Sequence, residues 1–240
     1  MRIIEPFYEI LSLPAGSALV KFIELVGRTC YKSEEKITDD SALAFVGRLI
    51  ASGHHSVIEH GNITVRFICD RGVSHELVRH RIASYSQEST RYANYSMDKF
   101  GNEITVIKPL FWSDQSAEYK IWLGAVRRAE EAYLALIKAG AKPEEARSVL
   151  PNSLKTEIVA TCNVREWRHI LSLRSSPAAH PQMRQIMIPL LKELHDRVPV
   201  LFDDIYEQYA ENTPGYVINR LHCRSNTSPV ALIEYSLSQN

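Results

Sequence analysis

The sequence centres on one thirteen-residue stretch, Arg79-His80-Arg81-Ile82-Ala83-Ser84-Tyr85-Ser86-Gln87-Glu88-Ser89-Thr90-Arg91. The stretch combines three arginines, a histidine and three serines with a glutamine and a glutamate. The planar guanidinium group of arginine fits the oxygens of phosphate and carboxylate. Because cations outnumber acidic side chains here, the stretch indicates a site for an external anion. The alternative is a solvated loop, although the apolar residues Ile82, Ala83 and Tyr85 argue against free coil.

The regions around this stretch show the periodicity of both helices and strands. Residues 73–78 predict a short helix that delivers Arg79 and Arg81 at its C-terminal end, with the serine-rich part following as a loop. Residues 62–70 alternate in polarity, which predicts a half-buried strand. Expected helix caps are Ser17, Asp39 or Asp40, and Asn163, and Pro6 suggests an edge position or a bulge. Further strands are expected at 2–11, 103–108 and 154–162, and helices at 17–28, 39–52, 114–139, 143–150, 163–174, 180–194 and 202–210.

Length, charge and cysteine spacing limit the function classes. The 240 residues, 45% of them hydrophobic, are enough for one sizeable domain. A formal net charge of zero argues against a general nucleic-acid binder, whose affinity rests on many Lys and Arg contacts to phosphates. The four cysteines lie far apart, which argues against metal ribbons and dense disulfides and favours a reducing cytoplasm. Neither a signal peptide nor a membrane-spanning apolar run is recognised, so no membrane partner is expected.

A cluster of histidines precedes the strand expected at 62–70. His54, His55 and His60 stand with Glu59 within seven residues, and imidazole and carboxylate are ligands that suit zinc or iron. The spacing is not that of H-E-x-x-H, so a core or supporting role is favoured over a metal site.

The arginine-rich stretch contains a recognisable pattern. Arg79-His80-Arg81, followed after seven residues by Ser89, reads RHR-x7-S. This pattern resembles the signature of the flavin-dependent thymidylate synthases, which are unrelated to the thymidylate synthases that use a cysteine nucleophile. Many family members carry Asn-Glu where this chain has Ser86-Gln87, a change that keeps hydrogen bonding but removes the charge at Gln87. Further similarity runs from about Gly53 to about His180.

Three other segments share the resemblance. The segment from Gly53 to His60 is similar to a G-H-x-x-x-x-E-H segment of the family's flavin pocket. Residues 163–174 resemble the second signature of the family, N-x-R followed by L-R, with His169 where several relatives have asparagine. Residues 145–151 resemble a segment whose arginine, here Arg147, binds the nucleotide. Relatives also have a flavin-contacting histidine near His180, which two extra residues precede here.

The resemblance implies a fold and a reaction. The fold is α+β, a single domain with a twisted, mostly antiparallel sheet flanked by helices. Residues 1–211 would form the catalytic domain and residues 212–240 a C-terminal tail. The implied reaction is the reductive methylation of dUMP to dTMP, with FAD as the tightly held cofactor, NADPH as reductant and methylenetetrahydrofolate as carbon donor. Family members are homotetramers whose active sites are shared between subunits.

The resemblance also implies the site residues. Arg174 is the catalytic residue, which polarises the uracil ring, and no metal is expected. The expected flavin contacts are His54, Ser56, Arg79, His80, Arg81, Gln87, Asn163, Val164, Arg165 and His169. The expected nucleotide contacts are Glu76, Leu77, Val78, Arg79, Gln87, Glu88, Ser89, Thr90, Arg91, Arg147 and Arg174.

Two other functions stay open from the residues alone. The same arginines suit a non-catalytic or nucleic-acid-directed phosphate binder, and the histidine cluster suits a metal phosphohydrolase. The chain has no G-x-G-x-x-G, P-loop or G-x-S-x-G motif, so neither a Rossmann nucleotide site nor a serine hydrolase is indicated. A visible absorption spectrum with a metal assay distinguishes the three functions, because only the synthase carries a flavin.

Overall fold

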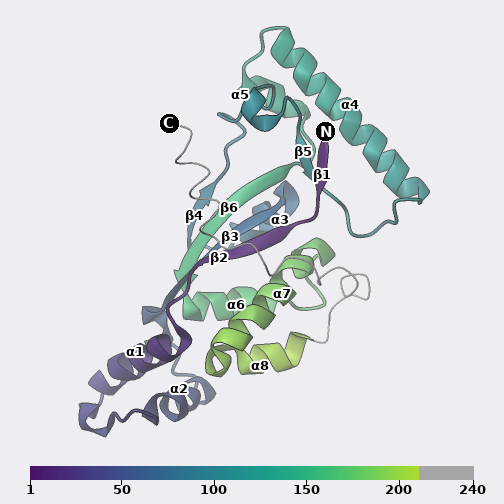
Figure 1. The fold of residues 1–240 in the computed structure, drawn as a ribbon. Helices are drawn as coiled ribbons and strands as arrows, with labels where there is room; N and C mark the ends of the chain where they lie inside the picture. The colour runs from purple at the N-terminus through teal and green to yellow at the C-terminus, as the bar shows by residue number, and fades with distance from the viewer. Residues whose placement is uncertain (211–240) are drawn as a thin grey trace.

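A four-stranded antiparallel sheet forms the centre of the molecule in the computed structural model, which describes residues 1–210 (Figure 1). Its order is β2-β3-β6-β4. The central strands β3 and β6 pair along their whole length, from Asn62 opposite Asn163 to Asp70 opposite Lys155. A separate parallel pair joins β1 to β5. The bounds are β1 Arg2–Ile4, β2 Phe7–Ser12, β3 Asn62–Asp70, β4 Ser84–Gln87, β5 Thr105–Ile107 and β6 Lys155–Asn163.

Helices surround this sheet, which confirms the expected α+β class. Figure 1 shows α1 and α2 beyond one end of the sheet, and α4 and α5 with the β1–β5 pair beyond the other. Helices α6 and α7 pack on the sheet, and α8 packs against both of them. None of the helices within residues 1–210 combines the length and the apolar character needed to cross a membrane. The bounds are α1 Gly16–Thr29, α2 Ser41–Ala51, α3 Arg71–Leu77, α4 Ala117–Lys138, α5 Pro143–Ala146, α6 Val164–Arg174, α7 Pro181–Arg197 and α8 Pro199–Tyr209.

Two hydrophobic cores stabilise the fold. The larger core joins the sheet to α1, α2, α6, α7 and α8, and Trp167 at its centre is fully buried. The indole N–H of Trp167 donates to the carbonyl oxygen of Ile63 at 3.0 Å, so the helix is fixed to the sheet by a hydrogen bond as well as by packing. The smaller core joins Tyr133 of α4 to Val106 of β5 and Leu154 just before β6. Strand β6 therefore begins where the two cores meet.

Several sequence predictions are confirmed. Strand β3 has the predicted bounds, and α6 begins after Asn163 and ends at Arg174. The Oδ1 atom of Asn163 accepts a hydrogen bond from the backbone N–H of Glu166 at 2.9 Å, as a cap should. Gly53 and Gly140 follow helices with φ of 73° and 98°, a conformation that favours glycine.

The serine-rich part of the arginine-rich stretch was expected to be a loop, and this is wrong. Residues Ser84–Gln87 form strand β4, which pairs with β6 through Tyr85 opposite Ala160. The pairing covers an edge of β6 that would otherwise expose unpaired backbone groups. Alternation places Tyr85 against the larger core and Ser84 and Ser86 outside it. Contacts with residues distant in sequence therefore determine that this segment is a strand and not a loop.

Two details of the N-terminal region also differ from expectation. The predicted strand at 2–11 is two strands in two sheets, separated at Glu5-Pro6, because proline has no N–H to donate to a ladder. Ser17 does not cap α1, which begins at Gly16 after Ala15. A Cβ on Gly16 would lie 2.3 Å from the carbonyl oxygen of Arg197, so only glycine permits this approach of α1 to α7.

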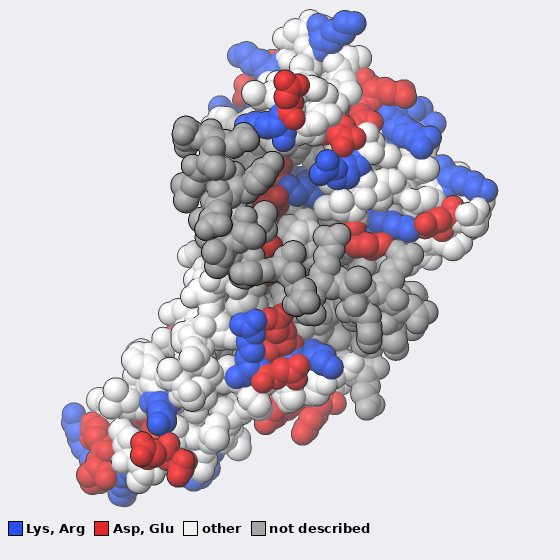
Figure 2. All heavy atoms as spheres, in the orientation of Figure 1, with Lys and Arg blue, Asp and Glu red and all other residues white. Residues whose placement is uncertain are grey.

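Charged side chains are mixed over the surface. On the face shown in Figure 2, the Lys and Arg side chains of the described residues are interspersed with Asp and Glu. On this face the described residues therefore form no broad positive patch for a polyanion, in agreement with the balanced composition.

Candidate active site

Two capped helices bring the catalytic candidate into place. Helix α3 starts after β3, where Oδ1 of Asp70 accepts from the backbone N–H of Val73 at 2.7 Å, and α6 starts after β6 at Asn163. Because β3 and β6 are antiparallel, the two helices begin at opposite ends of the strand pair. Their C-terminal ends meet where Arg174 contacts Glu76. The cation therefore lies at two helix C-termini, whose dipoles both favour positive charge.

Arg174 is held from three directions. Its Nη1 donates to Oε2 of Glu76 at 2.7 Å, and its Nη2 donates to the carbonyl oxygen of Glu76 at 3.1 Å. Its Nε donates to Nε2 of His80 at 3.0 Å. The Arg174 side chain is 16% exposed and that of Glu76 is 39% exposed, so the pair borders solvent. One N–H on each Nη is not used in these contacts and can meet a ligand.

His80 points into the protein, whereas its two arginine neighbours do not. The residue is 5% exposed, and its ring meets that of His169 edge to face, with centroids 5.5 Å apart. Burial, followed by the charges of Arg174 and His169, lowers the pKa of His80 to about 4. Arg79 and Arg81 are exposed, and no carboxylate within residues 1–210 pairs with either guanidinium group. The triplet is therefore divided between one inward imidazole and two outward cations.

Tyr85 fixes the backbone of this turn. Its hydroxyl lies 2.8 Å from the carbonyl oxygen of Leu77 and 2.9 Å from that of His80, and these two acceptors share its one proton. Burial raises the pKa of Tyr85, so the hydroxyl stays protonated and remains a donor. The tyrosine thus ties the end of α3 to strand β4.

Gln87 occupies an internal hydrogen-bond network. Its Nε2 donates to Oγ of Ser74 at 2.9 Å and to Oγ1 of Thr156 at 3.2 Å. The amide donates to both hydroxyls here, whereas a carboxylate in this position could only accept from them, so glutamine is hydrogen-bonded in these surroundings without a charge. The next residue, Glu88, accepts from Nζ of Lys155 at 3.0 Å and from the hydroxyl of Tyr95 at 3.2 Å.

Hydroxyls and arginines gather after β4. The hydroxyl of Ser89 accepts from the backbone N–H of Arg91 at 3.3 Å. Arg147, which follows α5, donates from Nη1 to Oγ1 of Thr90 at 3.4 Å. The Nε of Arg91 donates to Oε2 of Glu144 at 2.8 Å, in a pair whose side chains are 58% and 38% exposed. The structure thus joins two expected nucleotide segments that are far apart in sequence.

The second signature begins at the other end of β6. Arg165 donates from Nη1 to Oε1 of Glu59 at 2.6 Å, which links the start of α6 to the histidine segment. His54 and Ser56 are exposed in this region, and His169, which is also exposed, lies further along α6 against His80. Three other expected contact residues differ in exposure. Leu77 and Val164 are fully buried, backbone included, whereas Val78 is exposed.

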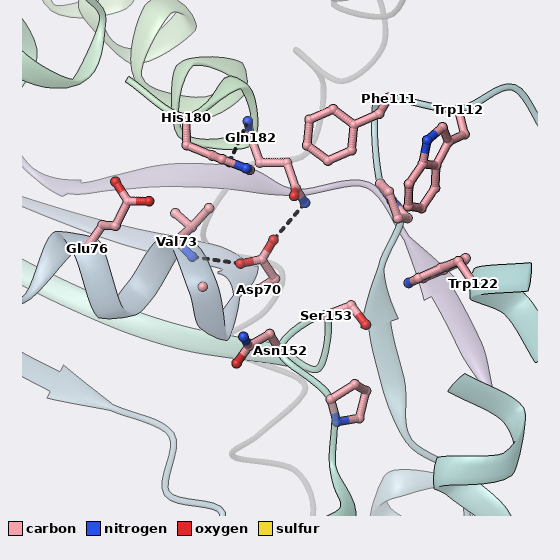
Figure 3. Close-up of a pocket in the computed structure, with 13 residues that line it drawn as sticks. Asp70, Val73, Glu76, Phe111, Trp112, Trp122, Asn152, Ser153, His180 and Gln182 are labelled. Carbon is pink, nitrogen blue, oxygen red and sulfur yellow. Dashed lines mark hydrogen bonds between the residues drawn. The ribbon is translucent and has the colours of Figure 1, made fainter. Parts of the chain in front are cut away.

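A cavity of about 410 Å³ adjoins Glu76 (Figure 3). Phe111, Trp112 and Trp122 line it, opposite Asp70 and the start of α7. Asp70 is buried, and burial raises its pKa. The Nε2 of Gln182, from α7, donates to Oδ2 of Asp70 at 2.7 Å. The aromatic walls suit a flat ring.

Sequence reasoning missed several of these residues. Glu166 lies 3.5 Å from Nδ1 of His80, and Tyr85 holds the turn, yet neither was singled out. The inward direction of Glu166 depends on the packing of α6, which the sequence alone does not show. The aromatic run Phe111-Trp112 was the available signal for the cavity.

Metal binding finds no support in this geometry. Within residues 1–210, no three side chains of His, Cys, Asp or Glu come together as a metal ion requires. The histidine segment instead contributes Glu59 to the contact with Arg165.

Comparison with known proteins gives a consistent picture. Residues 18–200 match the family model Thy1, described as thymidylate synthase complementing protein. A Geobacter sulfurreducens protein named flavin-dependent thymidylate synthase is 34% identical over 189 residues, covering 76% of this chain and 80% of that protein. A Pyrococcus abyssi protein of the same name is 34% identical over 167 residues, covering 69% and 68%.

One solved structure shows the same fold. The UMP/dUMP methylase PolB from Streptomyces cacaoi, bound with 5-Br dUMP, superposes with a TM-score of 0.70. The match covers 89% of this chain and 100% of that chain at 21% sequence identity. At this identity the likeness concerns the fold.

Proposed function

The chain belongs to the Thy1 family of flavin-dependent thymidylate synthases, and on that basis we propose that it converts dUMP to dTMP by reductive methylation. The enzyme is a methyltransferase that depends on a flavin. We propose FAD as this flavin, NADPH as its reductant and methylenetetrahydrofolate as the carbon donor. The observation that carries the proposal is Arg174, fixed by Glu76 and His80 with N–H donors left over.

Arg174 would act on the uracil ring of the bound nucleotide. Bond formation at C5 requires electron density in the ring, and negative charge then develops along the N3–O4 edge. A guanidinium group stays protonated at any working pH, so it stabilises that charge without a proton transfer of its own. Glu76 and His80 hold the group in one orientation before the nucleotide arrives, which limits the reorganisation needed during the reaction.

The loop after β4 would bind the phosphate end of dUMP. Ser89 and Thr90 supply hydroxyls there, and Arg91 and Arg147 supply forked cations. The exposed ion pair between Arg91 and Glu144 is worth little in water, so a phosphate can replace Glu144 as the partner of this arginine.

The residues present fit a flavin dinucleotide. Arg79 and Arg81 are exposed cations without a carboxylate partner among residues 1–210, which suits a pyrophosphate. The start of α6 offers backbone donors beside Arg165. When bound and reduced, the flavin supplies the hydride that completes the methyl group. The cavity in Figure 3, which Glu76 lines on the side away from the aromatic residues, adds aromatic walls for the flat ring of a second ligand.

The distance between the nucleotide loop and the start of the second signature supports sites shared between subunits. Lys155, near the nucleotide loop, and Asn163, in the second signature, are at opposite ends of β6. At about 3.3 Å per residue they lie roughly 26 Å apart. Exposed apolar side chains at Val78, Ile82 and Leu173, with exposed fractions of 37%, 69% and 48%, flank the arginines. A second copy of the chain would cover them, and we propose the homotetramer of the family.

A reducing compartment agrees with the thiol chemistry. Cys30, Cys69 and Cys162 are free thiols, and burial raises the pKa of Cys69 and Cys162, which keeps them unreactive. We therefore place the reaction in the cytoplasm.

The proposed function has a direct test. The purified protein should show a flavin absorption band and should form dTMP only when dUMP, methylenetetrahydrofolate and NADPH are all present. Light scattering on the same sample reports the oligomeric state. Protein without flavin, or dTMP formation without the folate, would contradict the proposal. Tight binding of RNA or DNA in place of dUMP would favour the phosphate-binder alternative.

Replacing Arg81 with alanine should weaken flavin retention. An exposed cation that pairs with a pyrophosphate contributes about 1.5–3 kcal/mol, so Arg81→Ala and Arg79→Ala should each bind FAD about tenfold or more weakly. The absorbance ratio of flavin to protein after gel filtration measures the loss, and circular dichroism checks the fold. Arg127→Ala, on the exposed face of α4, is the matched control. Full flavin occupancy in both site variants would refute the assignment.

A further inference from the structure

The ring nitrogens of His80 are positioned against other protein groups and not against a ligand site. The residue is 5% exposed, and both ring nitrogens face protein atoms. Its Nε2 lies 3.0 Å from Nε of Arg174, and its Nδ1 lies 3.5 Å from Oε1 of Glu166. The flanking Arg79 and Arg81 point outward, so a flavin held by them meets the outside of the turn.

The contact with Arg174 fixes the tautomer of His80. The Nε of an arginine always carries a proton and can only donate, so Nε2 of His80 must be the acceptor. The single proton of the neutral imidazole is therefore on Nδ1, on the side of the Glu166 carboxylate. Glu166 is 8% exposed, and its position is set by the capped first turn of α6.

We propose that Glu166 and His80 are positioning residues for Arg174: Glu166 retains the proton on Nδ1 of His80, and Nε2 of His80 then orients the guanidinium group. Glu76 holds the Nη atoms, and His80 prevents rotation about the last side-chain bonds by fixing Nε. This inference rests on the proposed function of Arg174. It gives the side chain of His80 a role that acts through the arginine, beside the expected flavin contact of this turn.

The surroundings keep this arrangement stable over the working pH range. The charged and titratable groups that face His80 are Glu166, His169 and Arg174 of α6, Glu76 of α3, and Tyr85 of β4. Because the pKa of His80 is lowered to about 4, the imidazole is neutral above that pH. Protonation would place an N–H against the N–H of Arg174, so the contact requires the neutral ring.

The main test compares two substitutions of His80. His80→Leu removes the acceptor and should lower kcat about tenfold to a hundredfold, the range for one lost hydrogen bond to a charged group. The Kd for dUMP and the flavin content should change little. His80→Gln can present an oxygen near the place of Nε2, so it should recover most of the loss. His75→Leu, an exposed histidine of α3, is the control for histidine removal.

A double-mutant cycle separates positioning from packing. If His80 acts through Arg174, then His80→Leu should cost no further turnover in an Arg174→Ala background. Equal losses in both backgrounds would overturn the proposal, as would kcat near that of the wild type in His80→Leu. Equal impairment of the folded Gln and Leu variants would also overturn it.

Glu166→Met provides a second route should His80→Leu fail to fold. It keeps the length of the side chain but removes the carboxylate, so kcat should fall at an unchanged KM for dUMP. Wild-type kcat in this variant would exclude the role of Glu166. A wild-type enzyme that forms no dTMP would instead refute the proposed function, so the two failures are distinguishable.

Discussion

Arg174→Ala is expected to lose at least about a hundredfold in turnover, the scale for removing one preorganised group that stabilises developing charge. The protein should keep its fold, because the Arg174–Glu76 pair is partly exposed and leaves no deeply buried charge behind. It should also keep its flavin, since Arg79 and Arg81 lie outside the pair. Initial rates of dTMP formation at saturating dUMP measure the effect directly.

Two further variants help to interpret the result for Arg174→Ala. Arg174→Lys should remain strongly impaired, because an ammonium group cannot reach Glu76 and His80 with a fork and still face the ring. Arg197→Ala, which removes an exposed arginine at the C-terminal end of α7, should have little effect. Near-normal kcat in Arg174→Ala would reduce Arg174 to a favourable charge at a helix end, and another residue would have to activate the ring.

Arg91→Ala and Arg147→Ala should each weaken dUMP binding about tenfold to a hundredfold. Both arginines border the hydroxyls of Ser89 and Thr90, and neither is buried. A charge-assisted bond to phosphate is lost in each variant, whereas the loss of the exposed Arg91–Glu144 pair costs little. Calorimetric titration with dUMP measures the Kd, and deoxyuridine without phosphate should bind both variants and the wild type similarly.

Substitution of Glu144, the carboxylate that pairs with Arg91, should have the opposite effect on dUMP binding. Glu144→Gln releases Arg91 without removing it, so dUMP affinity should stay at the wild-type level or rise. Arg48→Ala, on the exposed side of α2, controls for the loss of surface charge. Unchanged dUMP affinity in Arg91→Ala and Arg147→Ala would move the phosphate site elsewhere.

Local signals in the sequence predicted those elements whose structure is decided locally. Strand β3 shows clear alternation, and α6 has a cap at Asn163 and an apolar side up to Arg174, so both were predicted with their bounds. Strand β4 was not predicted, because it has only four residues and the strand with which it pairs, β6, lies about seventy residues further along the chain. Pairing over such a distance leaves no periodic signal.

The candidate site also has one part that was predicted from the sequence and another that was not. The resemblance named Arg174, His80 and Glu76, and the structure brings them together. It could not show that His80 points inward while Arg79 and Arg81 point outward, because that direction depends on the turn held by Tyr85. Nor could it show the hydrogen bonds of Gln87 to Ser74 and Thr156, which come from α3 and β6.

The two hydrophobic cores have a consequence for the motions of the enzyme. Ala146, next to Arg147, belongs to the smaller core, and Leu171, near Arg174, belongs to the larger one. A nucleotide that contacts both arginines bridges two regions able to open with different free energies. Binding of the nucleotide would couple the two regions into one cooperative unit. The product would then leave when the smaller region opens locally. The stability of α4 and its neighbours could then set the residence time of dTMP, far from any reacting atom.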